Sequence, residues 1–220
     1  MTVIDKDNFL LSVVMPVCNE ADTIRKVIDR VNIAPYRKEI IAGDDGSSDG
    51  TLEILEEINH DNLTICRHDS NYGKGRAIQT GFSVTTGDIV IIQDADLEYD
   101  PDQFPALLNP ILTGKADVVY GSRLVGHGEQ RVLYFWHYVG NRFLTLLSNV
   151  FTNINLTDME TGYKAFTRQA LDGITIKKKR FGFEPEITAK VAKKKDLRIY
   201  EVPIDLKKKI LGNWSIFVFR

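Results

Sequence analysis

Short runs of β-forming residues alternate with amphipathic stretches along the first half of the chain, and this alternation constrains the fold more than any other feature. The expected strands are residues 11–15, 39–42, 63–67, 88–93 and 117–120. Helical patterns lie between them at residues 21–31, 51–58, 75–85 and 102–112. Strands that alternate with helices in this way form parallel sheets whose faces are covered by the helices. The sequence therefore predicts an α/β fold with a mostly parallel central sheet.

The composition is that of an ordinary globular domain and excludes some classes of function. The chain has 220 residues, 43% hydrophobic and 26% charged, with a formal net charge of -2. This length fits a single domain, residues 1–220, and the balance is not that of a disordered or fibrous chain. The net charge provides no general attraction to polyanions, so we expect no nucleic-acid partner.

The first residues and the cysteines indicate a cytoplasmic protein. The segment MTVIDKDNFLLSVVMPV has acids before a short apolar run. It lacks the basic region and the small-residue cleavage site of a signal peptide. Cys18 and Cys66 are isolated from each other and from histidines at ligand spacing, so we expect neither a disulfide nor a zinc site.

A polar segment follows each expected strand. In chain order these segments are PVCNE, GDDGSSDGT, HDSNYGKG, DADLEYDP and GSR. Because ligands of open α/β sheets bind beyond the carboxyl ends of the strands, these segments are expected to form the binding site.

Asp94, Asp96 and Glu98 follow the apolar run IVII and are the expected metal ligands. Carboxylates without histidine or cysteine select Mg²⁺ or Mn²⁺, and these ions bind best when a substrate diphosphate completes the coordination shell. Taken alone, an Asp-x-Asp pair is more often a pair of solvated acids near a helix N-terminus. The comparable acidic loops at other strand ends favour the metal site.

Two other loops suit a nucleotide. Asp45 is expected to accept hydrogen bonds from a nucleobase or ribose, whereas Asp49 is expected to cap the helix that begins near Thr51. Glycines surround Lys74, so the backbone can approach an anion while Lys74 and Arg76 add positive charge. The alternative for this loop is a tight surface turn with a solvated lysine.

Two further places in the sequence have side chains that could bind a phosphate group. Arg123 follows the fifth strand, where a guanidinium can bind phosphate through two hydrogen bonds, although a surface salt bridge is the competing interpretation. Asn141 and Arg142 interrupt an apolar stretch, which indicates a partner that is either a phosphate or a structural carboxylate.

Acidic residues in the second half have two interpretations each. Asp158 and Glu160 in TDMETGYKAF are candidates for a general base toward an acceptor hydroxyl, and Asp158 is equally suited to cap a helix. Glu184 and Glu186 are expected to cap or orient a helix that begins near Glu184. A last strand is expected at residues 197–202.

The stretch at residues 131–151 is apolar and aromatic, but it does not predict a membrane span. His137, Asn141, Arg142 and Asn149 interrupt it, and such side chains are costly in a bilayer core. We expect no transmembrane helix. The pattern favours a helix packed on the sheet, with a helix lying at a membrane surface as the alternative.

The segments VVMPVCNE, AGDDGSSDGT, NYGKGRAI, QDADLEYDP, GSR, DMETGYKAF and RFGFEPEITAK occur in this order. Together they resemble the family 2 glycosyltransferases, in particular the dolichol-phosphate and polyprenol-phosphate sugar transferases. The resemblance implies a GT-A fold, Mg²⁺ or Mn²⁺, and an inverting displacement on a UDP- or GDP-sugar.

The resemblance also implies roles for individual residues. The donor site it implies comprises Pro16, Cys18, Asn19, Glu20, Asp45, Lys74, Asp94 and Ala95. Cys18 stands where a tyrosine is frequent, and Glu98 replaces a residue that is often glutamine. The residues expected to take part in catalysis are Asp96, Arg123 and Asp158, with Arg123 matching an arginine that meets phosphate.

The acceptor is predicted from chemistry. An attacking sugar hydroxyl must lose a proton to a base, whereas a phosphate monoester, with a second pKa of about 6, is mostly dianionic near neutrality and needs only cations. Arg123, Asn141 and Arg142 are expected to bind such a phosphate, carried by a lipid at the cytoplasmic face of a membrane. The alternatives are a saccharide hydroxyl acceptor and a weakly active donor-binding relative.

One segment departs from the family pattern. After EVPI, relatives usually continue through a Tyr-Gly-Arg segment, whereas this chain has DLKKKILGNWSIFVFR. The lysines at residues 207–209 replace the charge of the arginine but not its forked geometry, so we expect a correct fold with reduced activity and a divergent C-terminal part from about residue 205. A nucleotidyltransferase would show a Gly-rich basic signature near the first strand, and PVCNEADT is not one.

Overall fold

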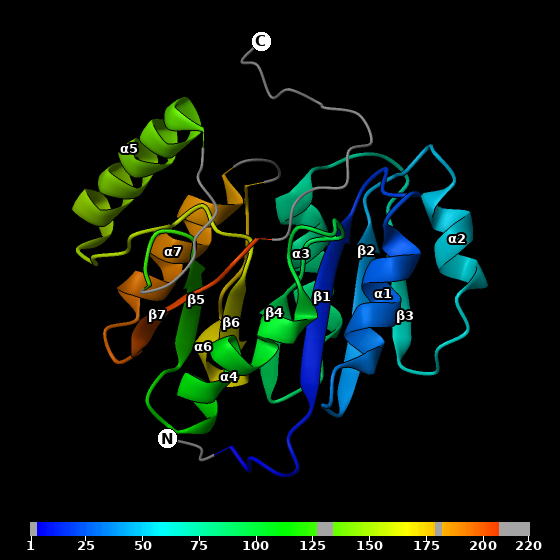
Figure 1. Ribbon diagram of the computed structural model, residues 1–220, viewed down its shortest axis with the longest axis horizontal. Coiled ribbons are helices and arrows are strands. Elements are labelled where there is room, and N and C mark those ends of the chain that lie inside the picture. The colour runs from blue at the N-terminus through cyan, green and yellow to red at the C-terminus, as the bar shows by residue number, and fades with distance from the viewer. Residues whose placement is uncertain (1–3, 127–133, 179–181, 207–220) are drawn as a thin grey trace.

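A computed structural model describes residues 4–126, 134–178 and 182–206 (Figure 1). The elements are β1 (Leu11–Val17), α1 (Ile24–Ile33), β2 (Lys38–Asp44), α2 (Thr51–Glu57), β3 (Leu63–Arg67), α3 (Lys74–Val84), β4 (Ile89–Ile92), η1 (Pro101–Gln103), α4 (Phe104–Leu112), β5 (Val118–Ser122), α5 (Phe135–Thr152), β6 (Lys164–Thr167), α6 (Arg168–Leu171), α7 (Phe183–Lys193) and β7 (Ile199–Pro203). All the strands and helices predicted for the first half are present, with bounds shifted by a few residues. The lysines at residues 207–209 lie outside the described residues.

The strands form one 7-stranded sheet in the order β3-β2-β1-β4-β6-β5-β7. The pairs β1 with β2, β2 with β3, β1 with β4 and β5 with β7 are parallel. β6 pairs antiparallel with both β4 and β5. The sheet is therefore mostly parallel, as predicted.

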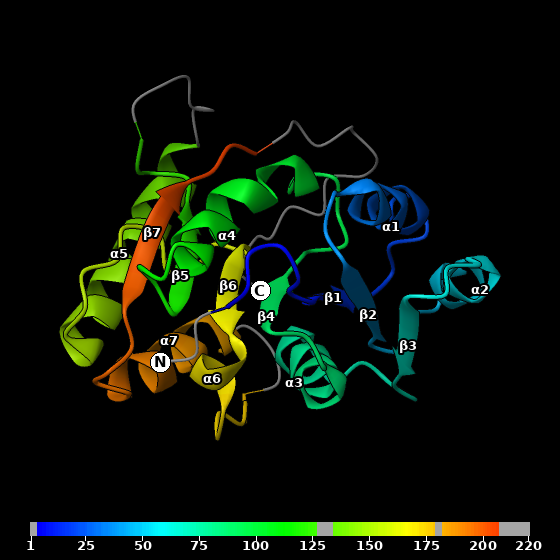
Figure 2. The same ribbon diagram turned by 90° about the horizontal axis from the view of Figure 1, so that it is seen from below.

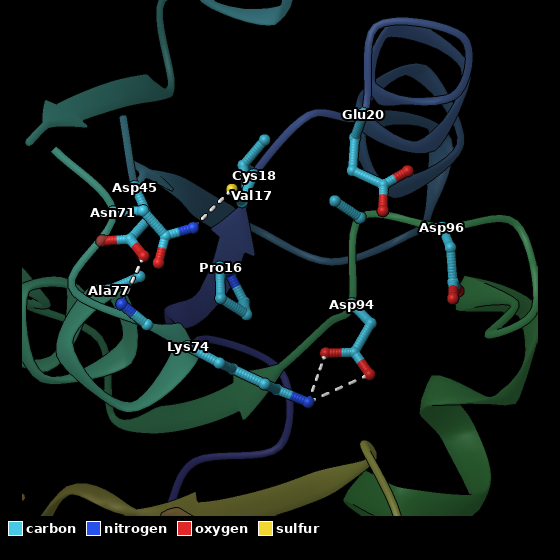
Figure 3. A pocket seen from close by; sticks show the side chains of 12 residues that line it. Pro16, Val17, Cys18, Glu20, Asp45, Asn71, Lys74, Ala77, Asp94 and Asp96 are labelled. Atoms are coloured by element: carbon cyan, nitrogen blue, oxygen red, sulfur yellow. Dashed lines mark hydrogen bonds and ion pairs between the residues drawn. The ribbon is translucent and has the colours of Figure 1, made fainter. Parts of the chain in front are cut away.

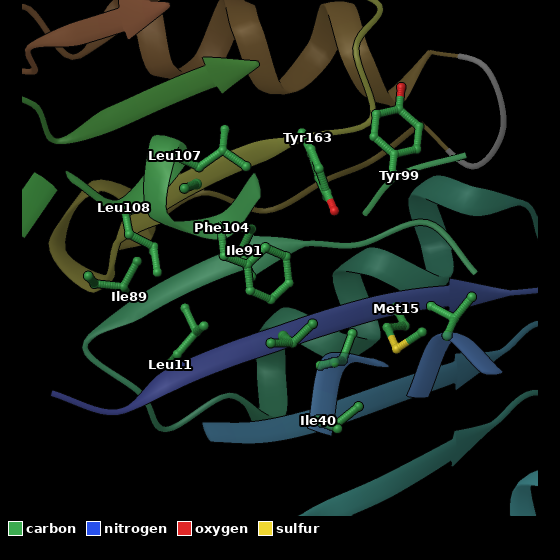
Figure 4. Packing of buried hydrophobic residues seen from close by; sticks show 14 of the residues in the cluster. Leu11, Met15, Ile40, Ile89, Ile91, Tyr99, Phe104, Leu107, Leu108 and Tyr163 are labelled. Atoms are coloured by element: carbon green, nitrogen blue, oxygen red, sulfur yellow. The ribbon is translucent and has the colours of Figure 1, made fainter. Parts of the chain in front are cut away.

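Helices cover both faces of the sheet (Figure 2). Side chains of α1, α2 and α4 pack with one set of strand residues, and those of α3, α6 and α7 pack with the other set. In β5, for example, Val119 belongs to the first core while its neighbours Val118 and Tyr120 belong to the second, because successive strand residues point to opposite faces. Figure 4 shows the first core, in which Phe104 of α4 lies beside Ile91 of β4 and Tyr163.

β6 was not predicted. Only four residues long, it reads KAFT, and three of them are buried. Such a short run shows no alternation of apolar and polar residues. The segment that contains it was interpreted through its acids, Asp158 and Glu160, and not as a strand. Its pairing partners β4 and β5 are distant in sequence, so only the folded sheet reveals it as a strand.

Helix α5 lies at one end of the molecule, where it packs against α7 (Figure 1). Only Thr145 and Ser148 of this helix are buried. Large apolar side chains are exposed along it, including Trp136 at 77% and Phe151 at 85%. The prediction that this stretch packs on the sheet is therefore wrong for most of its length. The helices in the described part of the chain lack the combination of length and apolar content that a membrane crossing requires.

Candidate active site

A cavity of about 240 Å³ lies at the carboxyl ends of β1, β2, β3 and β4 (Figure 3). Its lining residues are Pro16, Val17, Cys18, Glu20, Asp45, Asn71, Gly73, Lys74, Ala77, Asp94, Ala95 and Asp96. Every residue predicted for the donor site is among them except Asn19. Because the cavity contains the residues predicted for the donor, we call it the donor pocket.

Asn19 instead joins two of the loops that shape the pocket. It has a left-handed backbone with φ 55°. Its N–H donates to Ser47 Oγ at 3.0 Å, and its Oδ1 accepts from the Ser48 N–H at 2.9 Å. Asn19 therefore holds the loop after β1 against the loop after β2, which is a positioning role.

Asp49 stands next to the start of α2, near its predicted place. Gly50, with φ 94°, occupies the N-cap position. The Asp49 carboxylate accepts a hydrogen bond from the Thr51 N–H at 3.1 Å and another from the Ala21 N–H at 3.1 Å. The Asp49 carboxylate thus accepts a hydrogen bond from the first turn of α2 and another from the loop after β1. Hydrogen bonds lower the pKa of Asp49, although burial opposes them.

Asp45 is buried at the inner end of the donor pocket. Its Oδ1 lies 2.8 Å from His68 Nδ1 and accepts from the Tyr72 N–H at 3.0 Å, while its Oδ2 accepts from the Gly73 N–H at 2.5 Å. The other ring nitrogen, His68 Nε2, lies 2.9 Å from Thr80 Oγ1. A carboxylate has about four acceptor positions, and contacts within the described residues use three of those on Asp45. His68 was not predicted, because no local pattern indicates that it would meet Asp45.

Cys18 faces the same end of the pocket. Asn71 Nδ2 donates a hydrogen bond to Cys18 Sγ at 3.1 Å. Burial raises the pKa of the thiol, and the charge of Asp45 adds to this effect. Cys18 is therefore a neutral thiol near pH 7, and Asn71 is a further pocket residue that the sequence did not single out.

Lys74 extends from the start of α3 across the pocket to Asp94 (Figure 3). Its Nζ lies 2.9 Å from Asp94 Oδ1, 3.3 Å from Asp94 Oδ2 and 3.3 Å from Glu184 Oε1. Burial alone would lower the pKa of Lys74, but the charges of Asp94 and Glu184 outweigh it and raise the pKa. Glu184 was expected only to cap or orient α7, so its ion pair with Lys74 adds a role.

Asp94 and Asp96 both open into the pocket, as the metal prediction requires. Glu98 does not line it; its N–H donates to Asp96 Oδ1 at 3.1 Å. Across residues 4–126, 134–178 and 182–206, no three His, Cys, Asp or Glu side chains gather into a metal-binding group. The two aspartates are hard oxygen donors that fit Mg²⁺ or Mn²⁺ if a diphosphate and water supply the other ligands.

A glycine lets the loop before β6 pack against Asp94. A Cβ atom added at Gly162, in the loop before β6, would collide with Asp94 Oδ2 and would lie 2.9 Å from Tyr99 Cζ. The Gly162 N–H also donates to the Tyr99 hydroxyl at 2.8 Å. Only glycine therefore allows this loop to pack directly against the carboxylate.

Buried polar side chains hold the backbone around Asp94. Gln93 Nε2 donates to the carbonyl of Asp94 at 3.0 Å and to the carbonyl of Tyr99 at 3.2 Å. Tyr163 OH donates to Gln93 Oε1 at 2.8 Å. Burial raises the pKa of Tyr99 to about 12, so its hydroxyl remains protonated. None of these supporting residues was predicted.

Arg123 and Asp158 form a second cluster, beside the donor pocket. Arg123 Nε and Nη2 donate to the two oxygens of Asp158 at 2.6 and 2.7 Å, and Asn141 Nδ2 of α5 donates to Asp158 Oδ1 at 2.8 Å. Burial would raise the pKa of Asp158, but Arg123 lowers it. A carboxylate held in this way is a poor proton acceptor, so the general-base role considered for Asp158 does not fit; its geometry is that of a positioning residue for Arg123.

Glu160 lies near this second cluster. Burial raises its pKa, and the charge of Glu184 adds to the effect. Of the two acids considered as a base, Glu160 is the one whose pKa is shifted in the direction that favours proton uptake.

Lys164 is a further buried cation. It is fully buried, with Nζ 5.3 Å from the centre of the Tyr120 ring, and burial lowers its pKa to about 8.

The remaining predicted acceptor residues divide between two sides of α5. Asn141 faces inward, where its Nδ2 contacts Asp158 and its Oδ1 accepts from Thr145 Oγ1 at 3.0 Å. Arg142 is exposed, with its guanidinium 6.0 Å from the centre of the Tyr138 ring. The structure therefore brings Asn141, but not Arg142, to the Arg123 cluster.

The sheet order and the helices on both of its faces define an α/β domain with the GT-A fold. Similar solved structures include glucosyl-3-phosphoglycerate synthase from Mycobacterium tuberculosis in complex with Mn²⁺ and UDP, with a TM-score of 0.72 and 22% identity over 94% of this chain and 74% of that one. Mannosyl-3-phosphoglycerate synthase from Rubrobacter xylanophilus has a TM-score of 0.70, with 21% identity over 93% of this chain and 68% of that one. At these identities the likeness concerns the fold alone.

Sequence comparison gives the family. Residues 12–175 match Glycosyl transferase family 2, and the chain belongs to that family. It is 35% identical to the low-salt glycan biosynthesis hexosyltransferase Agl6 of Haloferax volcanii over 88% of this chain, but it spans only 47% of the length of that relative. It is 30% identical to an undecaprenyl-phosphate mannosyltransferase of Micrococcus luteus over 90% of this chain and 84% of that protein. A third relative is a UDP-N-acetylglucosamine–dolichyl-phosphate N-acetylglucosaminyltransferase of Methanococcus voltae, 29% identical over 89% of this chain and 84% of that protein.

Proposed function

We propose that this glycosyltransferase moves a sugar, with inversion, from a UDP- or GDP-sugar to a polyprenyl or dolichyl phosphate at a membrane surface. The observation that carries the proposal is the pair of adjoining clusters. The donor pocket has acidic groups for a nucleoside and a metal-bound diphosphate, and the neighbouring Arg123 cluster has a cation for a second phosphate.

The donor pocket supports a nucleoside diphosphate in one orientation. Asp45 and Asn71 lie at the end that suits a base or ribose, and Lys74, Asp94 and Asp96 lie at the end that suits the diphosphate. A divalent ion bound at Asp94 and Asp96 would neutralise the diphosphate as it leaves. Ala95 lies between these aspartates, and no bulky side chain from that position fills the pocket.

The Arg123 cluster supports a phosphate acceptor. Arg123 uses Nε and Nη2 on Asp158, and its side chain remains 21% exposed. Asp158 therefore fixes the plane of the guanidinium, which pre-organises it for a phosphate oxygen. Because a phosphate dianion is already a nucleophile, the transfer needs no proton acceptor at this position.

Helix α5 supports a location at a lipid surface. Its inner side contributes Asn141 to the Arg123 cluster, so the helix is continuous with the acceptor site. Its outer side exposes a large apolar surface of aromatic and aliphatic residues, which is the pattern of a helix that lies in a membrane interface. The residues of this surface, which we call the α5 face, are Phe135, Trp136, Phe143, Leu146, Val150 and Phe151. A lipid-linked acceptor bound at Arg123 would place its chain beside this face.

The experiment is transfer of label into lipid. Purified protein is incubated with radiolabelled GDP-mannose or UDP-glucose, polyprenyl phosphate and Mn²⁺, and label that extracts into organic solvent is measured. We expect extractable label with one donor and its loss in Asp96→Asn. Absence of label with both donors would contradict the proposal.

A second candidate acceptor, a saccharide hydroxyl, is favoured by Glu160, whose raised pKa suits a base. Glu160→Gln separates the two acceptors. With a phosphate acceptor the variant retains most of the rate, whereas with a hydroxyl acceptor the rate falls by about 10²- to 10⁴-fold because the base is lost.

A further inference from the structure

The Lys74 ammonium lies between two carboxylates from different elements. Asp94, after β4, is 2.9 Å away through Oδ1, and Glu184, in the first turn of α7, is 3.3 Å away through Oε1. Glu184 is 7% exposed, whereas the Lys74 side chain is 34% exposed and lines the donor pocket. The position of the lysine head group is therefore set by two anions, of which only Asp94 is a candidate metal ligand.

A divalent cation and an ammonium compete for the same carboxylate. Lys74 contacts both oxygens of Asp94, so a metal ion that binds there must displace the ammonium from at least one of them. Glu184 offers the displaced ammonium a second partner on the other side. The lysine can then stay in the pocket, within reach of an incoming diphosphate, instead of moving into solvent.

Glu184 is well placed to keep this second position available. Its carboxylate interacts electrostatically with a second lysine, the buried Lys164, as well as with Lys74. Its negative charge is therefore balanced in part even when Lys74 contacts Asp94. A carboxylate without such compensation would be costly to bury.

We propose that Lys74 is an internal counter-ion that occupies Asp94 while the donor pocket is empty and gives it up to the divalent cation that accompanies the donor. Glu184 is the positioning residue that receives the ammonium. The inference rests on the proposed metal-dependent donor binding, and it adds that the chain itself weakens metal binding until the diphosphate arrives.

The test is a titration of the whole protein with Mn²⁺ in the absence of nucleotide, with free Mn²⁺ followed by electron paramagnetic resonance. Lys74→Gln removes the competitor, so Mn²⁺ should bind about two- to fivefold more tightly than to the wild type, which is the range expected for a partly exposed ion pair. Lys115→Gln is the matched control. It removes the same charge from an exposed lysine between α4 and β5, outside the donor pocket, and it should change Mn²⁺ affinity much less.

A double-mutant cycle tests the role of Glu184. In the wild-type background, Glu184→Gln should weaken Mn²⁺ binding, because Lys74 then has only Asp94 to contact. In the Lys74→Gln background the same substitution should have little effect, since the residue acts through the lysine. Equal effects in both backgrounds would indicate a simple field effect of the carboxylate and would overturn the role given to Glu184. Thermal unfolding of each variant establishes that it is folded.

The outcomes separate the inference from the function on which it rests. If wild-type protein binds no Mn²⁺ even with UDP or GDP present, the metal-dependent function fails and the inference fails with it. If wild-type protein binds Mn²⁺ with nucleotide, but Lys74→Gln binds it no more tightly than Lys115→Gln, only the inference is overturned.

Discussion

Gly162→Ala is the substitution whose effect follows most directly from the structure. The new Cβ would collide with Asp94 Oδ2 and would lie 2.9 Å from Tyr99 Cζ and 3.0 Å from Tyr99 Cε2, whereas ordinary contacts begin near 3.4 Å. The ring of Tyr99 is buried and cannot move easily, because its hydroxyl accepts the Gly162 N–H and Tyr163 packs against its ring. The Asp94 carboxylate must therefore shift.

The expected size of the effect comes from this overlap. Relieving it displaces the carboxylate by about 1 Å, and a misplacement of that size in a reacting complex costs on the order of 100-fold in rate. The strain also lowers the free energy of unfolding by about 1–3 kcal/mol, as overpacking in a filled site does. Activity should thus fall much more than the stability loss alone would explain, and Mn²⁺ affinity should fall with it.

The assay measures initial rates of sugar transfer at saturating donor, together with the melting temperature and the Mn²⁺ affinity. Gly140→Ala is the control, because its Cβ position within α5 has no neighbour within 4 Å in the described part of the chain, apart from the helix itself. It should retain activity and gain up to about 1 kcal/mol of stability. A Gly162→Ala protein that melts near the wild-type temperature and transfers sugar at the wild-type rate would refute the reasoning about Asp94.

Three further predictions concern the other clusters. Asp158→Asn should lower the free energy of unfolding near pH 7 by about 3–5 kcal/mol in denaturant titrations, since the half-buried Arg123 guanidinium loses its charged partner. Because the pKa of Asp158 is lower in the folded protein, its contribution to the free energy of unfolding is complete above the unfolded pKa near 3.8 and is lost as the pH falls below it. If Asp158→Asn and the wild type lost the same stability between pH 7 and low pH, this would be contradicted. His68→Ala should weaken UDP or GDP binding by about tenfold in calorimetry, because Asp45 loses a hydrogen bond that orients it, while His60→Ala, at the surface, should not. Phe143→Asp with Val150→Asp should abolish co-sedimentation with lipid vesicles and leave the melting temperature unchanged, because both side chains are exposed; retained sedimentation would refute the role of the α5 face.

The sequence predicted the parts of the fold that depend on local pattern. The strands β1 to β5 were visible because apolar runs such as IVII are bounded by polar loops, and the donor pocket followed because parallel strands end at a common edge. The position of Asp94 and Asp96 at this edge was predicted for the same reason.

Long-range pairing accounts for what the sequence did not reveal. Nothing near Asp158 indicates that both its oxygens contact Arg123, which is 35 positions away, and nothing near His68 indicates Asp45, which is 23 positions away. The exposure of α5 was misjudged because a helix with apolar residues on most sides is usually buried, and its sequence does not show what covers it. Such facts depend on the packing of elements that are distant in the chain.

The reversed direction of β6 has a consequence for how the site is divided. A strand that runs against β4 and β5 begins at the edge where those strands end, so the loop that enters β6 is delivered between Asp94 and Arg123. Residues 158–162 of this loop contact both clusters, whereas the loops after β1, β2 and β3 contribute side chains that line the donor pocket. Under the proposed function the chain is therefore modular: the loop into β6 and helix α5 can change together to suit another acceptor while the first hundred residues keep the same donor.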